Sequence, residues 1–352
     1  MRIMRKIEPI LDVKNLYTRF YTESGVVEAL DGVNFDVGYG EPVGIVGESG
    51  CGKTVTSHSV LRILPKNGRI LQPPSEIYYK GVNLLDLTDE QMRHVRGKEA
   101  AMIFQDPMTS LNPIFKISDQ MVEVIQLHRK VNKNEARDIA IEMMEAVGIP
   151  DSAERIDNYP HQFSGGMRQR ILIARALALQ PSLLIADEPT TALDVTIQAQ
   201  VLEIIKEMQK QFGLALMLIT HNLGVVAEIT KRVHIFYGGR VVESGPTEEI
   251  FVNPFHPYTR ALFDSIPSLE QDKTRLETIP GTVPQLINPP QGCRFHPRCK
   301  YATEICRMAR PPDVWVTETR RVQCHHWEEL DLTIDKEKVK EVRRSTVSVE
   351  GV

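Results

Sequence analysis

The stretch GESGCGKT, residues 47–54, decides the fold of this chain. It fits the phosphate-loop pattern G-x-x-x-x-G-K-[ST], and the segments on either side confirm the motif. Before it, EPVGIVG (41–47) ends in a short apolar run typical of a buried parallel strand. After it, TVTSHSVLRILP (54–65) predicts a helix that stops at Pro65. We therefore expect a loop between strand and helix whose backbone N–H groups and helix N-terminus bind phosphate.

Each residue of this loop is a candidate nucleotide contact. Lys53 is expected to neutralise the β- and γ-phosphate oxygens, and Thr54 to bind Mg²⁺. Cys51 occupies a spacer position of the motif, where a cysteine is interpreted as neutral, with sensitivity to oxidation as the alternative. The full set of predicted nucleotide contacts in the loop is Gly47, Glu48, Ser49, Gly50, Cys51, Gly52, Lys53 and Thr54.

An acidic segment later in the chain predicts a magnesium ligand and a general base. LLIADEP (183–189) is an apolar strand that ends in Asp187, which could bind Mg²⁺ through water, and Glu188, which could act as general base on an attacking water. A helical pattern (196–212) and another buried strand (213–221) follow. Strands that alternate with helices predict an α/β fold around a mostly parallel sheet.

The composition excludes several classes of protein. The chain has 352 residues, 42% hydrophobic and 25% charged, with a formal net charge of −4, so no global basic field predicts nucleic-acid binding. No apolar run reaches the roughly 18 residues that a membrane span needs. Glu8 and Asp12 interrupt the N-terminal segment where a signal peptide would be apolar. We expect a cytoplasmic chain that reaches the membrane only through a partner.

The segment FSGGMRQR (163–170) discriminates among phosphate-loop proteins, because it resembles the signature of the ABC ATPase family. Ser164 is a good helix N-cap, and Gly165 and Gly166 allow close approach of a phosphate. Five features stand in the family's order: the phosphate loop, Gln105 in AMIFQDP, the signature, the Asp-Glu strand end, and His221 after ALMLIT.

This resemblance implies a RecA-like ABC nucleotide-binding domain with an antiparallel β subdomain and a helical subdomain. It assigns Gln105 to sensing Mg²⁺ and the membrane partner, Thr191–Asp194 to a dimer contact, and His221 to the γ-phosphate. It also assigns adenine stacking to an aromatic residue near the N-terminus; Phe20 is favoured over its neighbour Tyr21, which stays open as the alternative.

The same resemblance implies a mechanism shared by two subunits. Two ATP molecules lie between them, each held by the phosphate loop of one chain and by Ser164, Gly165 and Gly166 of the other. ATP binding closes the dimer and hydrolysis opens it. The predicted catalytic residues are Glu188, His221 and Gln105, and the predicted Mg²⁺ residues are Thr54, Gln105 and Asp187.

Two segments resemble importers of peptides more closely than other ABC proteins. These are FQDPMTSLNP (104–113) and NPFHPYTRALFDSIP (253–267), and Met167 resembles the D-type member of their pair of ATPases. The resemblance implies a second ATPase subunit, two transmembrane permeases, an extracytoplasmic solute-binding protein, and a peripheral location on the cytoplasmic face of the membrane. Nickel or oligosaccharide import, a non-transport ABC ATPase, and a stand-alone metal or redox protein remain the alternatives.

Four cysteines gather near the C-terminus, at Cys293, Cys299, Cys306 and Cys324. In a reducing compartment such a cluster indicates metal binding rather than disulfides. Thiolate count alone allows either tetrahedral Zn²⁺ or a [4Fe–4S] cluster. The pattern resembles that of peptide-importer ATPases that carry a [4Fe–4S] cluster, which is the favoured interpretation.

Composition also places the domain boundaries. Prolines become frequent after about residue 246, so we expect an ATPase domain over 1–245, with its helical subdomain at about 106–164, and a cysteine-rich extension over 246–330. Residues 331–352 mix charges without an apolar face, which predicts a flexible tail.

Overall fold

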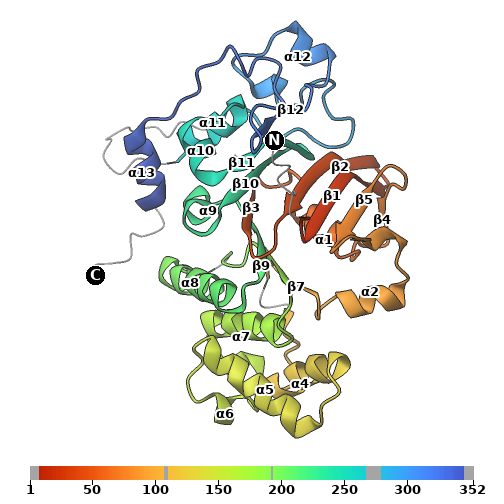
Figure 1. Ribbon diagram of the computed structural model, residues 1–352, viewed down its shortest axis with the longest axis vertical. Coiled ribbons are helices and arrows are strands. Elements are labelled where there is room, and N and C mark those ends of the chain that lie inside the picture. Colours follow the sequence, from red (N-terminus) through yellow and green to blue (C-terminus); the bar gives the residue numbers. More distant parts are fainter. Residues whose placement is uncertain (1–7, 107–109, 192, 267–278, 345–352) are drawn as a thin grey trace, which may run out of the picture. The chain divides into compact units, whose positions relative to one another are not determined.

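The computed structural model describes residues 8–106, 110–191, 193–266 and 279–344, and the chain divides into two compact units (Figure 1). Of the described residues, those within 8–86 and 218–344 form the first unit, and those within 87–217 form the second. The first unit therefore combines the N-terminal strands with the proline-rich C-terminal part of the sequence. The consecutive domains expected from composition, 1–245, 246–330 and 331–352, stay a prediction.

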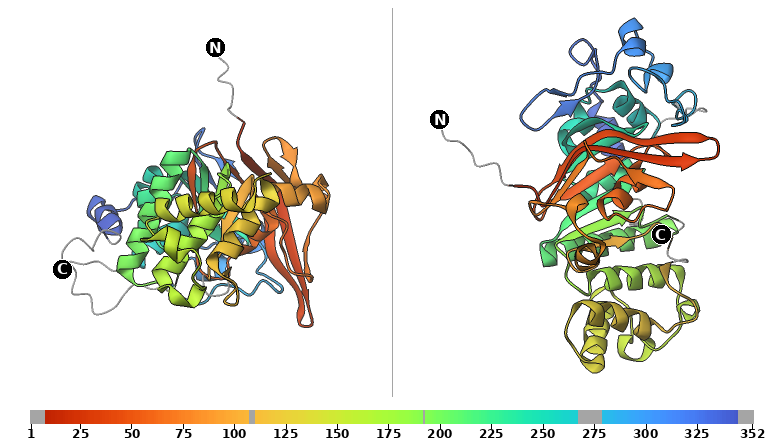
Figure 2. Two further views of the ribbon diagram at one scale, coloured as in Figure 1. Left: turned by 90° about the horizontal axis from the view of Figure 1, so that it is seen from below. Right: turned by 90° about the vertical axis from the view of Figure 1, so that its right-hand side faces the viewer.

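An antiparallel sheet forms the N-terminal part of the first unit. Its order is β2-β1-β5-β6, with β4 also paired to β1, and Figure 2 shows β1 and β2 as a long twisted pair of strands. The hydrophobic residues Leu11, Val13 and Leu16 are buried, which ties β1 to the core. The strands are β1 (Leu11–Thr22), β2 (Gly25–Val37), β4 (Gly68–Ile70), β5 (Glu76–Tyr79) and β6 (Val82–Asn83), followed by a 3-10 helix at Leu84–Asp86.

A second sheet in this unit contains the strand that leads into the phosphate loop. β3 (Pro42–Val46) is fully buried and pairs in parallel with β10 (Arg232–Tyr237), which pairs antiparallel with β11 (Arg240–Pro246). The sheet continues antiparallel through β13 (Arg321–Val322) to β12 (Val314–Trp315). Because β12 and β13 belong to the C-terminal extension, the extension completes the sheet of β3 rather than forming a separate lobe.

Short helices of this unit contribute to one apolar core with this sheet. Val46 and Tyr237 lie in one apolar cluster with Tyr258, Phe263 and Phe295 of the extension. The helices are α1 (Lys53–Val60), α9 (Leu223–Ile229), α10 (Thr247–Val252), α11 (Pro257–Asp264), α12 (Glu304–Met308) and α13 (Lys336–Arg344), with a 3-10 helix at His296–Arg298. The helix after the phosphate loop thus ends before Pro65, as the sequence predicts.

Helix α13 lies where the sequence analysis expects a flexible tail. Its residues Val339 and Val342 are buried in the same apolar cluster as Val226 of α9. These two valines are spaced so that they share one helix face. Two apolar residues among charged ones gave too weak a pattern to predict this packing from sequence.

The second unit is mainly helical. Two parallel strands, β7 (Ala100–Ile103) and β8 (Leu183–Asp187), pair with Ile103 opposite Ala186. The helices are α2 (Asp89–Val95), α4 (Ile117–His128), α5 (Lys133–Ala146), α6 (Ser152–Arg155), α7 (Gly165–Leu177) and α8 (Val195–Phe212), with a 3-10 helix at Pro160–Gln162. Two helices, α4 and α5, are separated by a short loop, and the Asn132 side chain caps the second of them by accepting a hydrogen bond from the Glu135 N–H.

Strand β9 (Ala215–Thr220) begins in the second unit and ends in the first. All six of its residues are buried, as its unbroken apolar sequence predicts. Across the described ranges of the chain, no helix is both long enough and apolar enough to cross a membrane.

Candidate functional site

The phosphate loop follows β3 and leads directly into α1. A Cβ atom on Gly47 would collide with the carbonyl oxygen of Phe236, so no larger residue fits there. Gly52 caps α1 in the left-handed region at φ 105°, where a side chain is strained, and its Cβ would lie 2.9 Å from the carbonyl oxygen of Ala29. Backbone geometry and close packing therefore explain two glycines of the motif. Ser49 and Gly50 form the exposed tip of the loop.

The Lys53 side chain binds backbone oxygens of the phosphate loop. Its side chain is buried, and Nζ donates hydrogen bonds to the carbonyl oxygens of Gly47 (2.7 Å) and Glu48 (3.0 Å). Thr54 is half-buried in the first turn of α1. A cation held at the base of a loop of backbone amides, beside a helix N-terminus, is suited to binding polyphosphate.

Cys51 contributes its backbone to the loop rather than a reactive thiol. Its carbonyl oxygen accepts a hydrogen bond from the Gly239 N–H (2.9 Å) in the turn between β10 and β11. The side chain is fully buried, and burial raises the pKa of the thiol to about 11. The thiol is therefore protonated at neutral pH, and only the thiolate is a good nucleophile.

In the second unit, the acidic residues lie at the carboxyl end of β8. Asp187 is buried at the strand end, and Glu188 follows, half-buried, with φ 45°. A non-glycine residue with positive φ is strained, and such residues cluster at functional sites. Glu188 Oε2 accepts hydrogen bonds from Gln105 Nε2 (3.1 Å) and Thr191 Oγ1 (2.9 Å).

Parallel pairing explains why Gln105 meets Glu188. Ile103 at the end of β7 lies opposite Ala186 of β8, so the residues that follow both strands emerge at the same edge. The two residues are far apart in sequence, and only this pairing brings them together. The structure thus joins three of the predicted residues, Gln105, Glu188 and Thr191, in one hydrogen-bonded group.

The signature segment forms the N-terminus of α7. Ser164 is exposed and caps the helix, accepting a hydrogen bond from the Met167 N–H (3.3 Å). Gly165 is half-buried. Gly166 is buried, and a Cβ there would lie 2.6 Å from Ile197 of α8. Gly166 is thus required for helix packing, a reason that the sequence analysis did not give, while Ser164 and Gly165 leave the helix N-terminus accessible.

The remaining predicted residues are distributed over both units. Asp194 caps α8 through the Ile197 N–H (2.9 Å), and Ala192 of the same loop lies outside the described residues. His221 is exposed after β9, and Asn222 beside it caps α9. The phosphate loop and His221 belong to the first unit, whereas Gln105, Asp187, Glu188 and the signature belong to the second.

The two aromatic candidates for adenine stacking differ in exposure. The Phe20 ring packs on Gly68 of the neighbouring β4, where a Cβ would lie 2.9 Å from the ring. Tyr21, on the opposite face of the strand, is 52% exposed. Phe20 therefore has a fixed orientation, which suits a stacking platform, and Tyr21 has none of that support.

The four C-terminal cysteines line one small cavity in the first unit, and all of them are free thiols. Burial raises the pKa of Cys293 to about 11 and that of Cys324 to about 12, and it also raises the pKa of Cys299. Within the described part of the chain, no three His, Cys, Asp or Glu residues are grouped closely enough to hold a metal ion. The expected metal site is not confirmed.

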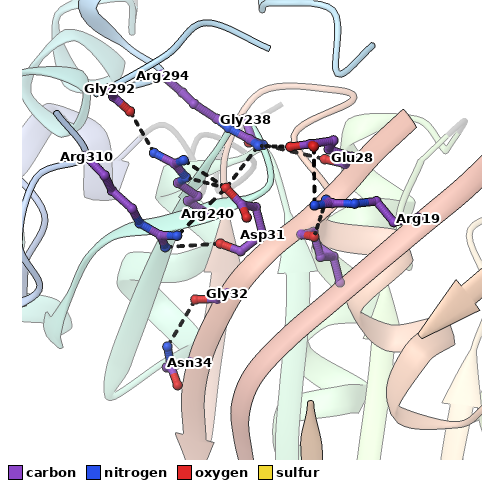
Figure 3. Close-up of polar contacts among 11 residues, drawn as sticks. Arg19, Glu28, Asp31, Gly32, Asn34, Gly238, Arg240, Gly292, Arg294 and Arg310 are labelled. Atoms are coloured by element: carbon purple, nitrogen blue, oxygen red, sulfur yellow. Dashed lines mark hydrogen bonds and ion pairs between the residues drawn. The ribbon is translucent and has the colours of Figure 1, made fainter. Parts of the chain in front are cut away.

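Arginines from different parts of the first unit pair with two carboxylates of β2, an arrangement that the sequence analysis did not predict (Figure 3). The Arg294 side chain is 2% exposed and pairs with Glu28 Oε2 (2.8 Å) and Asp31 Oδ2 (3.0 Å) of β2. Arg240 also pairs with Asp31 (2.8 Å). Burial alone would raise the pKa of Asp31, but Arg294 and Arg240 outweigh it, and the pKa lies below its usual value.

Two family models match successive parts of this chain. The family model "ABC transporter" matches residues 30–191, and the model "Oligopeptide/dipeptide transporter, C-terminal region" matches residues 242–306. A probable peptide ABC transporter ATP-binding protein of Sinorhizobium fredii is 52% identical over 87% of this chain and 91% of its own length. This chain belongs to the ABC transporter ATP-binding proteins.

Other ABC transporter proteins are also similar to this chain over most of their length. The oligopeptide transport ATP-binding protein of Haemophilus influenzae is 48% identical over 86% of this chain and 93% of its own length. The dipeptide transport ATP-binding protein of Bacillus subtilis is 47% identical over 90% and 95%. Among solved structures, the dimeric bacterial ABC transporter cassette MJ0796 matches with a TM-score of 0.60 and 25% identity, covering 67% of this chain and 98% of that one. The ABC nucleotide-binding fold predicted from the sequence is confirmed. The prediction that the protein is an ATPase is also confirmed.

Proposed function

We propose that this ABC protein is the ATP-hydrolysing subunit of a peptide importer and that it works as one of a pair of such subunits. The observation that carries the proposal is the combination, in one chain, of a complete set of nucleotide motifs with a C-terminal region of the oligopeptide and dipeptide transporter type at residues 242–306. Relatives described as oligopeptide and dipeptide transport proteins match over most of their length.

In the proposed reaction, the phosphate loop binds the β- and γ-phosphates of ATP through its amides and Lys53. Thr54, Gln105 and Asp187 would hold Mg²⁺, which neutralises phosphate charge when bound. Glu188 accepts a proton from the attacking water, and its bonds from Gln105 and Thr191 fix the carboxylate for that step. His221 contacts the γ-phosphate, and Phe20 stacks on adenine.

The exposed N-terminus of α7 supports sharing of the site between two subunits. Ser164 and Gly165 present a positively polarised helix end that is free of bulky side chains, which suits an anion supplied by another chain. We propose a second ATPase subunit, Thr191–Asp194 as a dimer contact, two permeases and a solute-binding protein as partners, and a peripheral position on the cytoplasmic face of the membrane.

A transport assay tests this proposal directly. The subunit, co-expressed with candidate permeases and a solute-binding protein in vesicles, should hydrolyse ATP faster when a dipeptide or oligopeptide is added. Stimulation by nickel or an oligosaccharide instead would support import of those solutes by the same machinery. Hydrolysis that needs no permease would support a non-transport ABC ATPase.

For the four cysteines, we propose a [4Fe–4S] cluster, with Zn²⁺ as the alternative. A single Zn²⁺ with Zn–S bonds of about 2.3 Å needs its four sulfurs close together. The four thiols line one small cavity, and four cysteine sulfurs are also the usual ligand set of a [4Fe–4S] cluster. The His326 N–H donates to Cys324 Sγ (3.4 Å), a contact of the kind that stabilises thiolate ligands.

Anaerobic purification with analysis of iron, sulfide and zinc tests the cluster. Broad visible absorbance with about four irons per chain, lost in Cys299→Ser, supports it. Stoichiometric zinc in a colourless protein would establish the alternative. A protein with neither metal would contradict both.

A further inference from the structure

The second residue of the phosphate loop, Glu48, is held by the C-terminal extension. Arg298 donates two parallel hydrogen bonds to its carboxylate, from Nη1 to Oε2 (2.7 Å) and from Nη2 to Oε1 (3.0 Å). The Arg298 side chain is 4% exposed and that of Glu48 is 27% exposed. A bidentate pair of this kind fixes both the distance and the orientation of the two groups, and partial burial limits its screening by solvent.

A second residue of the extension holds the backbone at the same position. The Glu48 N–H donates to the hydroxyl oxygen of Tyr258 in α11 (2.9 Å). Tyr258 is fully buried, and burial raises its pKa well above the usual value, so the hydroxyl is neutral at physiological pH. Because this N–H is bonded to Tyr258, its contribution is to orient the loop rather than to contact phosphate.

Both contacts come from side chains that are themselves immobilised. Arg298 also donates to the carbonyl oxygens of Pro280 (2.8 Å) and Ile279 (3.2 Å). The rings of Tyr237, Tyr258 and Phe295 pack together, with centroid separations of 4.5–5.3 Å. Phe295 and Arg298 lie on the segment between Cys293 and Cys299. The same short segment therefore lines the cysteine cavity and carries the arginine that binds the phosphate loop.

The position of Glu48 affects Lys53, the residue expected to bind the phosphates of ATP. Lys53 Nζ binds the carbonyl oxygens of Gly47 and Glu48, which flank the N–H that Tyr258 accepts. On the other side of the loop, Arg294 binds Gly238 O, and the adjacent Gly239 N–H donates to the carbonyl oxygen of Cys51. Two arms of the extension therefore support the loop from different directions.

We propose that Arg298 and Tyr258 are positioning residues of the phosphate loop, through which the C-terminal extension sets the affinity of this subunit for ATP. A loop that is already ordered binds its ligand without the cost of ordering it, so loss of either contact lowers the fraction of chains in the binding-competent form. The effect is expected on binding, because both residues act through Glu48 of the phosphate loop.

Calorimetric titration of the full-length chain with ATPγS and Mg²⁺ tests the proposal. Arg298→Gln is expected to raise the dissociation constant for ATPγS roughly 5–20-fold. Tyr258→Phe, which removes only a hydroxyl group, is expected to raise it roughly 2–4-fold. In the assembled transporter, KM for ATP should rise by similar factors while kcat at saturating ATP stays within about twofold. Arg298→Lys should restore part of the affinity, since it keeps the charge but not the bidentate geometry.

Arg260→Gln is the matched control. Arg260 is also an extension arginine that binds a carboxylate, Asp264 (3.0 Å), and a backbone carbonyl, Leu332 O (3.2 Å). Its replacement should leave the ATPγS dissociation constant unchanged within about twofold. An equal loss of affinity in Arg260→Gln, or an unchanged or tighter dissociation constant in both Arg298→Gln and Tyr258→Phe, would overturn the proposal.

A double-mutant cycle identifies the route of action. If Arg298 acts through Glu48, then Arg298→Gln combined with Glu48→Gln should bind ATPγS no more weakly than the poorer single variant, because the two changes remove one interaction. Additive losses would show that Arg298 acts elsewhere and would contradict the proposal.

Discussion

Two carboxylates, Glu188 and Asp31, show how differently this chain uses the same chemical group. Glu188 is half-buried at the end of β8, in a strained backbone conformation, and accepts hydrogen bonds from the uncharged side chains of Gln105 and Thr191. Asp31 lies among the guanidinium groups of Arg294, Arg240 and Arg310. A carboxylate oriented by neutral donors keeps its charge available for a proton, whereas one paired with several arginines is committed to holding elements together.

The largest effect is expected from Glu188→Gln. The change keeps the shape of the side chain but removes the proton acceptor, so kcat should fall roughly 10²–10⁴-fold in the assembled transporter. ATP binding and the free energy of unfolding should change little, because the lost group is half-buried and strained. Single-turnover hydrolysis with radiolabelled ATP measures this, with Glu203→Gln on the exposed face of α8 as control. Near-normal turnover would remove Glu188 from the mechanism.

Arg294→Gln should instead lower the free energy of unfolding. Glu28 and Asp31 lose a partner whose side chain is 2% exposed, but Asp31 keeps Arg240 and Glu28 keeps Arg19, so we expect a loss of about 1.5–3 kcal/mol. Denaturant unfolding of the purified chain measures this loss. Arg137→Gln, which breaks an ion pair with exposures of 32% and 46%, serves as control and should cost less than about 1 kcal/mol. Equal costs in the two variants would show that burial does not separate these pairs.

A smaller effect should appear in the pH dependence of stability. The folded-state pKa of Asp31 lies below its unfolded value of 3.8. Its contribution is therefore complete above that value and is lost as pH falls through the folded pKa. Unfolding curves between pH 6 and pH 2 should show wild type losing stability at the acid end, and Asp31→Asn should show a smaller decline over that window. Parallel declines in both proteins would contradict the assigned role of Asp31.

The nucleotide motifs could be predicted from the sequence because each depends on local geometry. Gly52 needs a left-handed backbone, Lys53 belongs to the same loop as the carbonyl oxygens that it binds, and Ser164 caps the helix that it begins. The sequence analysis gave Gly166 only a phosphate role and missed its packing against Ile197. That reason depends on a second helix, whose position no short motif records.

The C-terminal extension was predicted less completely. Its proline-rich composition and its four cysteines are visible in the sequence, but its strands β12 and β13 are two residues each and carry no pattern of their own. Helix α13 was expected to be unpacked, since only Val339 and Val342 mark its buried face. Short elements of this kind are stabilised by the surface that they join, so their own residues predict them poorly.

The sequence by itself determined the chemistry of this protein: a phosphate loop, an acidic strand end and a signature helix, each specified within a few consecutive residues. Only the tertiary structure decided that Arg298 grips Glu48, that Arg294 pairs with Asp31, and that Gln105 meets Glu188. The physical reason is range. Backbone conformation and helix capping act between neighbours along the chain, whereas ion pairs and strand pairing join residues whose separation in sequence carries no information about their distance in space.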